Sequence, residues 1–176
     1  MARLFATELK LPVMRNAFSP QNYLRLKNDI LALMFTQMLN RFDLEQDSDG
    51  KPWEPLKSQQ FERRNKKIKD KSRKGNIKIL QDDGTLRKSF TIEGAEGNET
   101  SVSGDEVYLA TTVPYAAAHN DGLRIKHPGT SDGFGRGIKI DPYFIQLPER
   151  RMTGFSDDDV NEIRELIAGH MSEEGF

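Results

Sequence analysis

The segment Tyr108–Gly122 reads YLATTVPYAAAHNDG, and the other predicted elements flank it on both sides. Its first half alternates, because Leu109, Thr111 and Val113 occupy one side of an extended backbone, and this alternation predicts a strand. Pro114 lacks the N–H that a sheet ladder needs, so we expect the strand to end there. Three alanines then favour one helical turn. The Asn-Asp-Gly sequence ends this turn, because these residues tolerate a left-handed backbone conformation. The segment therefore predicts a strand that runs into a small-residue corner.

The imidazole in this corner raises the question of an active site. The chain has three histidines, His119, His127 and His170, and no H-x-x-x-H, C-x-x-C or calcium-loop pattern, so we expect no metal site and no cofactor. Neighbouring side chains on a turn point apart, so the His119-Asn120-Asp121 sequence does not by itself form an acid–base pair. We interpret the corner as a packing element. A small hydrolase or nuclease built on His119 is the alternative.

Length and composition restrict the class of protein. The 176 residues and the formal net charge of -1 fit one domain, residues 19–176, preceded by an extended N-terminal arm, residues 1–18. The arm either lies on a neighbouring subunit or frays. Hydrophobic content of 36% against 30% charged is low for a compact enzyme and typical of an elongated protein or of one with long loops. The absence of cysteine favours a reducing cytoplasm, and we expect neither a signal peptide nor a membrane span.

A long helix is predicted from Pro20 to Phe42. Ser19 can cap its first turn, and proline suits its first position. Its apolar residues cover an arc of about 240°, whereas an ordinary surface helix needs a stripe about 100° wide. The excess must be covered by the rest of the chain or by a second copy, and we favour the second copy. The residues that we expect at this oligomer interface are Leu26, Ile30, Leu33, Met34 and Met38.

Trp53 is the only tryptophan, and it stands between two prolines in the segment Gly50–Leu56. The prolines limit the entropy that is lost when this segment becomes ordered. We therefore expect Trp53 to fill a groove of the protein, with a ligand-stacking tryptophan as the alternative.

The segment 61–74 is the most basic part of the chain. Its cations are Arg63, Arg64, Lys66, Lys67, Lys69, Lys71, Arg73 and Lys74. Such a run can neutralise several phosphates, but Phe61 is the only aromatic residue near enough to stack on a base. We expect either a solvated segment or contact with the backbone of a nucleic acid.

From Asn76 onward the apolar pattern becomes strand-like, and Leu86, Phe90 and Ile92 mark one core-facing side. Turn signals at Asp82-Asp83-Gly84, Gly94–Gly97 and Gly104-Asp105 divide this region, which predicts an antiparallel meander of about three strands.

The glycine-rich loop 123–137 is either a flexible excursion or the tip of a hairpin that resumes over Ile138–Phe144. A last helix follows, with Ser156 as its cap, Asp159 completing a capping box and Gly175 at its end. Together these elements predict an α+β fold, in which a long N-terminal helix and a C-terminal amphipathic helix pack on a small antiparallel β-sheet meander.

Four segments, in this order, resemble one protein family. They are GKPWEPL at Gly50–Leu56, KIL at Lys78–Leu80 with GTLRKSF at Gly84–Phe90, YAAAHNDG at Tyr115–Gly122, and PERRMTGFS at Pro148–Ser156. They are similar to the signatures G-x-P-W-x-P-L, K-x-L followed by T-G-x-L-x-x-S, Y-A-x-x-H-x-x-G and P-x-R-x-F-x-G-x-S of the phage virion-morphogenesis, or tail-completion, proteins of Mu-like phages and prophages. Met152 replaces an aromatic residue, and Asp83 replaces a threonine.

The resemblance implies a non-enzymatic structural protein of the head–tail junction (a head-tail connector) or of the tail end, which acts as copies arranged in a ring. Its implied partners are copies of itself, other head–tail junction or tail proteins and, non-specifically, DNA in the channel. It would be found in the host cytoplasm during assembly and then in the virion, without a membrane. The motif residues expected to have structural roles are Trp53, Tyr115, His119, Gly122, Pro148 and Arg150.

Overall fold

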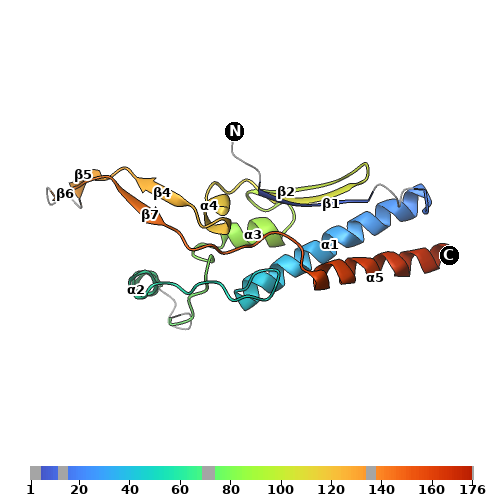
Figure 1. Cartoon of the computed structure of the whole chain (residues 1–176), viewed down its shortest axis with the longest axis horizontal. Coiled ribbons are helices and arrows are strands. Elements are labelled where there is room, and N and C mark those ends of the chain that lie inside the picture. The colour runs from blue at the N-terminus through green and yellow to red at the C-terminus, as the bar shows by residue number, and fades with distance from the viewer. Residues whose placement is uncertain (1–4, 12–15, 69–73, 134–137, 176) are drawn as a thin grey trace.

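The computed structural model describes residues 5–11, 16–68, 74–133 and 138–175. The molecule is elongated: two long helices lie side by side toward one end, a three-stranded sheet covers the first of them, and a narrow arm projects at the other end (Figure 1). Helices combined with a small antiparallel sheet confirm the α+β class. No helix in the described ranges is both long enough and apolar enough to cross a membrane.

Helix α1 (Pro20–Leu44) forms the centre of the fold and confirms the long helix that the sequence predicts. The Ser19 hydroxyl caps it by accepting the N–H of Asn22 at 3.3 Å. The helix ends at Glu45, whose backbone is left-handed with a φ of 56°. Its buried side packs against the sheet and against two other helices, so α1 is covered on several sides and keeps one side exposed to solvent.

This central position corrects the oligomer interface that we expected on α1. Four of its five residues lie in the core of their own chain: Leu26, Ile30, Met34 and Met38, each at most 2% exposed. Leu33 is half-buried and packs against the same core. Most of the wide apolar arc is covered because several elements of the same chain pack against the helix, although Leu24 stays 49% exposed. The prediction that a second copy covers these four residues is therefore wrong.

The main sheet has the strand order β1-β3-β2 and is antiparallel. Strands β2 (Asn98–Ser103) and β3 (Glu106–Thr111) form a hairpin around the predicted turn at Gly104-Asp105. Strand β1 (Phe5–Lys10), from the predicted N-terminal arm, pairs with β3 of its own chain along its full length. Leu109 of β3 is fully buried and belongs to the same core as α1.

Helix α3 (Thr85–Thr91) replaces a strand of the predicted meander. Gly84 precedes it in a left-handed conformation, and the Asp83 carboxylate accepts the Thr85 N–H at 2.9 Å, so the predicted turn starts a helix. Leu86 and Phe90 are four residues apart and thus share one side of this helix, where both are buried against α1. The strand prediction was wrong because a spacing of four residues fits both periodicities over so short a segment.

The predicted corner follows β3. A short helix, α4 (Ala116–Asn120), forms at the three alanines, and Gly122 ends it with a φ of 59°. Both features confirm the turn that the sequence predicts.

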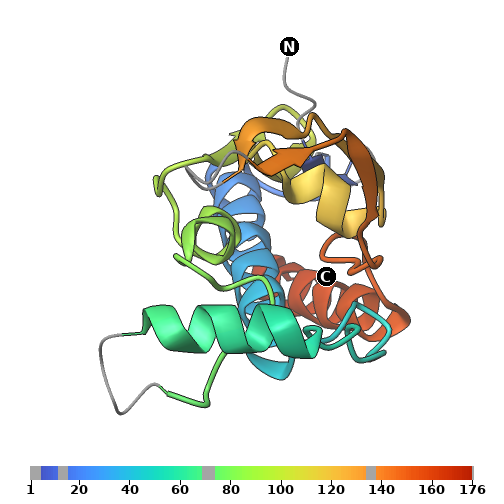
Figure 2. The ribbon, with the colours of Figure 1, turned by 90° about the vertical axis from the view of Figure 1, so that its left-hand side faces the viewer.

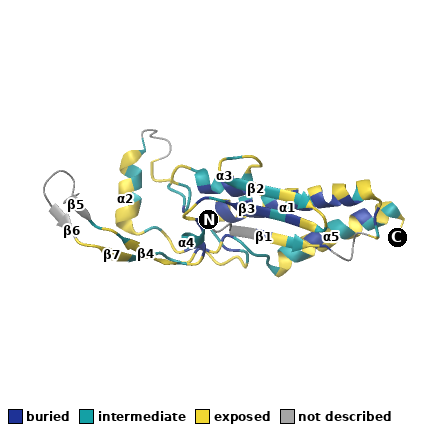
Figure 3. Cartoon of the chain, turned by 90° about the horizontal axis from the view of Figure 1, so that it is seen from above, coloured by how far each residue is buried: buried dark blue, intermediate teal, exposed yellow. Residues whose placement is uncertain are grey.

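The chain then leaves the core as an arm. Strand β4 (Arg124–His127) pairs with β7 (Tyr143–Gln146), and β5 (Thr130–Gly133) pairs with β6 (Ile138–Ile140) farther out. The hairpin interpretation of the loop 123–137 is thereby confirmed for its described part. Figure 3 shows that exposed residues dominate the inner part of this arm, whereas buried residues concentrate in α1, α3 and the main sheet.

Helix α5 (Asp157–Glu174) has the predicted capping box, in which Ser156 and Asp159 bond each other's backbone N–H groups. It lies beside α1 and is joined to it by the ion pair between Arg41 and Asp159. Helix α2 (Ser58–Lys67) has no buried residue and crosses the arm end of the molecule (Figure 2).

Candidate functional site

Trp53 is a packing residue of the core. It is 5% exposed, and its ring meets that of Phe42 edge-on, with the centroids 5.5 Å apart. The indole Nε1 donates a hydrogen bond to the carbonyl of Arg151 at 3.1 Å. The prediction that Trp53 fills a groove of the protein is confirmed, and its one polar atom is already used.

Arg150 connects two of the sequence motifs. Its side chain is buried, and Nε and Nη2 both donate to the carbonyl of Glu54, at 3.0 and 2.8 Å. Its backbone N–H donates to the carbonyl of His119 at 2.9 Å. Burial lowers the pKa of Arg150 from its ordinary value, but a guanidinium stays charged at any physiological pH. Arg150 therefore joins the Trp53 segment to the Tyr115–Gly122 corner.

His119 lies half-buried in this junction. Its ring stands edge-on to that of Tyr115, with a centroid distance of 6.2 Å. Burial, and secondly the charge of Arg150, lower the pKa of His119, so the imidazole is neutral at neutral pH. Its Nδ1 atom is buried without a hydrogen-bond partner among the described residues. A general base is normally oriented by a third group, and no described carboxylate bonds this ring.

Asn120 and Gly122 hold the corner against the segment that leads into α5. The Asn120 side-chain oxygen accepts the N–H groups of Met152 and Thr153, at 2.7 and 3.3 Å. A Cβ added to Gly122 would lie 2.8 Å from the backbone nitrogen of Glu149, closer than such contacts occur. The corner is thus a packing element, as the sequence analysis favoured.

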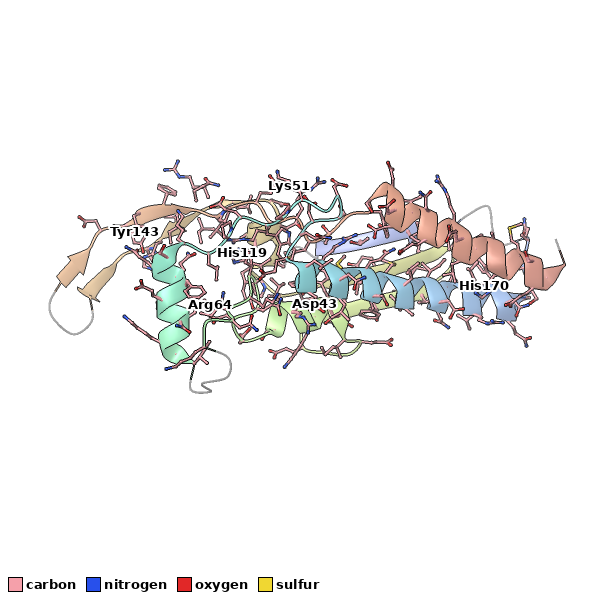
Figure 4. The ribbon with its side chains drawn as sticks, turned by 90° about the horizontal axis from the view of Figure 1, so that it is seen from below. Asp43, Lys51, Arg64, His119, Tyr143 and His170 are labelled. Carbon is pink, nitrogen blue, oxygen red and sulfur yellow. The ribbon has the colours of Figure 1, made fainter. Side chains whose placement is uncertain are left out.

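A cleft of about 430 Å³ opens beside this junction. Its walls come from the motif segments, from α2 and from the inner end of β7, and Figure 4 labels two of the lining residues, His119 and Arg64. The lining residues that belong to the motifs or to the basic segment are Glu54, Pro55, Leu56, Arg63, Arg64, Leu80, Leu86, Tyr115, His119, Pro148 and Arg150. The cleft combines apolar walls with guanidinium groups. In the described part of the chain no three histidine, aspartate or glutamate side chains come together as metal ligands would.

The structure divides the basic segment into different environments. Arg64 is 11% exposed and forms an ion pair with Asp82 at 3.0 Å, so it is not free for a nucleic acid. Arg63, Lys66 and Lys67 are exposed on α2, as is Lys74 in the turn after it. The remaining cations, Lys69, Lys71 and Arg73, lie outside the described residues.

The sequence analysis did not single out the arm, which carries exposed apolar side chains. Tyr143 and Phe144 are 44% and 54% exposed, and so are Leu123 and Ile125 at 45% and 40%. His127 stacks on Tyr143 with a centroid distance of 4.7 Å. The signal in the sequence is a pair of short runs with apolar residues on either side of a glycine-rich tip, and this pattern fits a hairpin as well as a flexible loop.

Comparison with protein families matches residues 9–172 to the phage virion morphogenesis family. Comparisons with curated proteins and with solved structures gave no match. The matched region contains all four motifs, which meet around Arg150, His119 and Trp53. The chain therefore belongs to the phage virion morphogenesis family, as the motifs predicted.

Proposed function

We propose that the protein is a non-enzymatic structural subunit of a tailed phage or prophage, and that copies of it form a ring that acts in tail completion or head–tail joining. Membership of the family implies a role in virion morphogenesis. The proposed partners are other copies and other proteins of the head–tail junction or tail. We expect the protein in the host cytoplasm during assembly and afterwards in the virion.

The internal use of the motif residues supports a structural role. Trp53 and Arg150 donate their side-chain hydrogen bonds to carbonyl groups of the same chain. Asn120 binds the N–H groups that would otherwise be unpaired before α5. A catalytic motif instead directs its polar groups at a site where a substrate can bind. The motifs therefore act as joints that fix the position of the arm, α2 and α5.

The shape of the molecule supports assembly with other chains. A two-stranded ribbon is marginally stable by itself in water, yet β4 and β7 project from the core and carry exposed aromatic side chains. Exposed apolar patches of this kind mark surfaces that bind other proteins. With the apolar side of α1 buried, the arm is the better candidate for contact between subunits.

Deletion of the gene from the phage genome tests the proposal. We expect lysates that contain unjoined or incomplete particles by negative-stain electron microscopy, and we expect the wild-type protein in purified virions at a fixed copy number by quantitative mass spectrometry. Normal infectious particles that form without the protein would overturn the proposal.

An alternative activity built on His119 is tested in the same complementation assay. The His119→Gln variant should restore particle assembly at neutral pH, because the neutral imidazole serves as a packing group. The hydrolase or nuclease interpretation requires the opposite result, with soluble protein at wild-type levels and no viable particles.

Contact with the backbone of DNA is a second candidate function, favoured by the exposed cations of α2. Arg63, Lys66 and Lys67 lie within about 100° of one another around the helix axis. We expect the triple glutamine variant to reduce the salt slope of DNA binding by about 0.9 for each phosphate that the variant no longer neutralises. Unchanged binding by this variant would contradict a role of α2.

A further inference from the structure

We infer that copies of this chain bind head to tail, with one face of the arm of one copy lying on the exposed face of α5 of the next copy. The inference rests on the proposed ring and names its two surfaces.

The first surface is a cationic face of the arm. Residues directly opposite in an antiparallel pair point to the same side of the sheet, and the register places Arg124 opposite Gln146 and Lys126 opposite Phe144. The Arg124 guanidinium lies 4.2 Å from the centroid of the Phe144 ring. We call Arg124, Lys126 and Phe144 the cationic arm face. Neither cation forms an ion pair with a described residue, so both charges are available to a partner.

Apolar exposure is concentrated in the same two strands, on both faces of the arm. Eight large apolar residues in the described ranges are strongly exposed, and four of them lie in β4, in β7 or directly beside them. These four are Leu123, Ile125, Tyr143 and Phe144. Phe144 lies on the cationic arm face, whereas the register places Ile125 and Tyr143 on the opposite face. An aromatic ring flanked by cations can both lose water on binding and direct the approach of an acidic partner.

The second surface is the solvent side of α5. Asp157, Asp158, Glu162 and Glu165 are exposed and lie within about 140° around the helix axis. We call these four residues the acidic α5 face. Asp158 and Glu165 have no ion-pair partner in the described part of the chain.

Small side chains continue the same side of α5 toward its C-terminus. Ala168, Gly169 and Ser172 are all exposed there, and a Cβ added to Gly169 would meet no atom within 4 Å. A protruding ring such as that of Phe144 can therefore approach the helix closely beside the carboxylates.

The two surfaces lie toward opposite ends of the elongated molecule (Figure 1). Each copy thus offers one cationic and one acidic surface. An interface between two different surfaces repeats from copy to copy and closes into a ring where the rotation between neighbours allows it. Opposite charge selects this pairing over arm-to-arm or helix-to-helix contact, because like charges repel.

Charge reversal tests the pairing in the full-length protein. The arm-reversed variant R124E/K126E and the helix-reversed variant D158K/E165K should each associate with themselves at least about a hundredfold more weakly than the wild type, because like charges then face each other. Sedimentation velocity and light scattering measure the association.

A mixture of the two variants provides the decisive result. The acidic arm of the first variant matches the basic helix of the second, and the basic arm of the second matches the acidic helix of the first. We expect the equimolar mixture to regain large assemblies. The matched control K66E/K67E, which reverses two cations on α2, should associate like the wild type.

Engineered disulfides provide an independent test, because the chain has no cysteine. Under oxidation, the K126C/E165C variant should form a ladder of cross-linked chains on a denaturing gel, and the K67C/E165C control should not. This test does not require the charge-reversed chains to fold.

Three results would overturn the inference: reversed variants that associate as strongly as the wild type, a mixture that stays dissociated while both variants are folded by circular dichroism, or the absence of the ladder. A wild-type chain that remains monomeric at 100 times the concentration used in these experiments would also overturn the inference. The ring-forming role in the virion is judged separately, by particle assembly after gene deletion and by copy number.

Discussion

Gly122 is the residue at which the corner and the segment before α5 come closest. An alanine there combines a positive φ, which costs about 1–2 kcal/mol, with a steric overlap against the Glu149 backbone, which costs about 1–3 kcal/mol more. We expect Gly122→Ala to destabilise the fold by the sum of both effects in urea unfolding. Gly104→Ala is the matched control, because Gly104 has a φ of 53° but open space around its Cα. Equal losses of free energy of unfolding for the two variants would show that the Glu149 backbone moves away from the added methyl group at no cost.

His119 gives the stability of the protein a dependence on pH. Its pKa in the folded state is lowered, chiefly by burial, so the unfolded chain binds a proton at a higher pH than the folded chain does. The contribution of neutral His119 to the free energy of unfolding is complete above the ordinary histidine pKa of about 6.5. This contribution is lost as the pH falls through that value toward the pKa of the folded state. We expect the wild type to lose more free energy of unfolding than His119→Gln between pH 7.5 and pH 5.5. The His127→Gln variant, changed on the arm, should retain the loss seen in the wild type.

Arg41 is the most deeply buried cation between the two long helices. It is 4% exposed and donates to the carbonyl of Met152 at 2.8 Å and to the Asp159 carboxylate at 2.6 Å. Replacement by methionine leaves that carboxylate without its cationic partner, and we expect a loss of about 3 kcal/mol in thermal or urea unfolding. The exposed ion pair of Arg25 with Glu173 is the comparison, since Arg25→Met should cost less than about 1 kcal/mol. A small loss at both sites would mean that water replaces Arg41.

At the scale of elements, local signals determined which predictions succeeded. The helices α1 and α5 were predictable because Ser19 and Ser156 form caps that depend only on neighbouring residues. Helix α3 was not predictable, because the spacing of Leu86 and Phe90 fits the period of a helix as well as that of a strand. Only the contact with α1 selects the helix. The family motifs indicated Arg150 and Trp53, but no sequence pattern indicates that both bond carbonyls of distant segments.

The interface prediction failed for a related reason. The arc of apolar residues on α1 is a property of the sequence, but the number of elements that surround α1 is a property of the tertiary structure. Met34 and Met38 are covered by segments that follow α1 in the chain by tens of residues. Amphipathicity alone therefore does not distinguish an enclosed helix from one that meets a second subunit.

The arm should be the least protected element in the unassembled chain. The inner strands β4 and β7 pair only with each other within the described residues, whereas β3 is paired on both sides. We expect amides of β4 and β7 to exchange with deuterium much faster than those of β3, and to become protected when copies assemble. Hydrogen-exchange mass spectrometry below and above the association threshold measures both. Unchanged exchange of the arm on assembly would place the contact elsewhere.

At the scale of the whole molecule, the separation of charge predicts how salt affects assembly. The screening length falls from about 30 Å at 0.01 M salt to about 8 Å at 0.15 M, so contact between the cationic arm face and the acidic α5 face weakens over this range. We expect the association constant of the wild type to fall with salt and that of Phe144→Ala to fall in parallel from a lower starting value. Sedimentation at several salt concentrations measures both curves. Association that strengthens with salt would indicate a purely apolar interface.

The pairing of β1 with β3 has a consequence for the order in which the chain folds. Strand β1 leaves the ribosome first, but its hydrogen-bonding partner is synthesised about 100 residues later, whereas β2 meets β3 across a two-residue turn. Loop closure over so long a separation is slow compared with hairpin formation. The nascent polypeptide therefore completes its sheet only after translation of the middle third, and the hairpin offers an open edge until β1 docks.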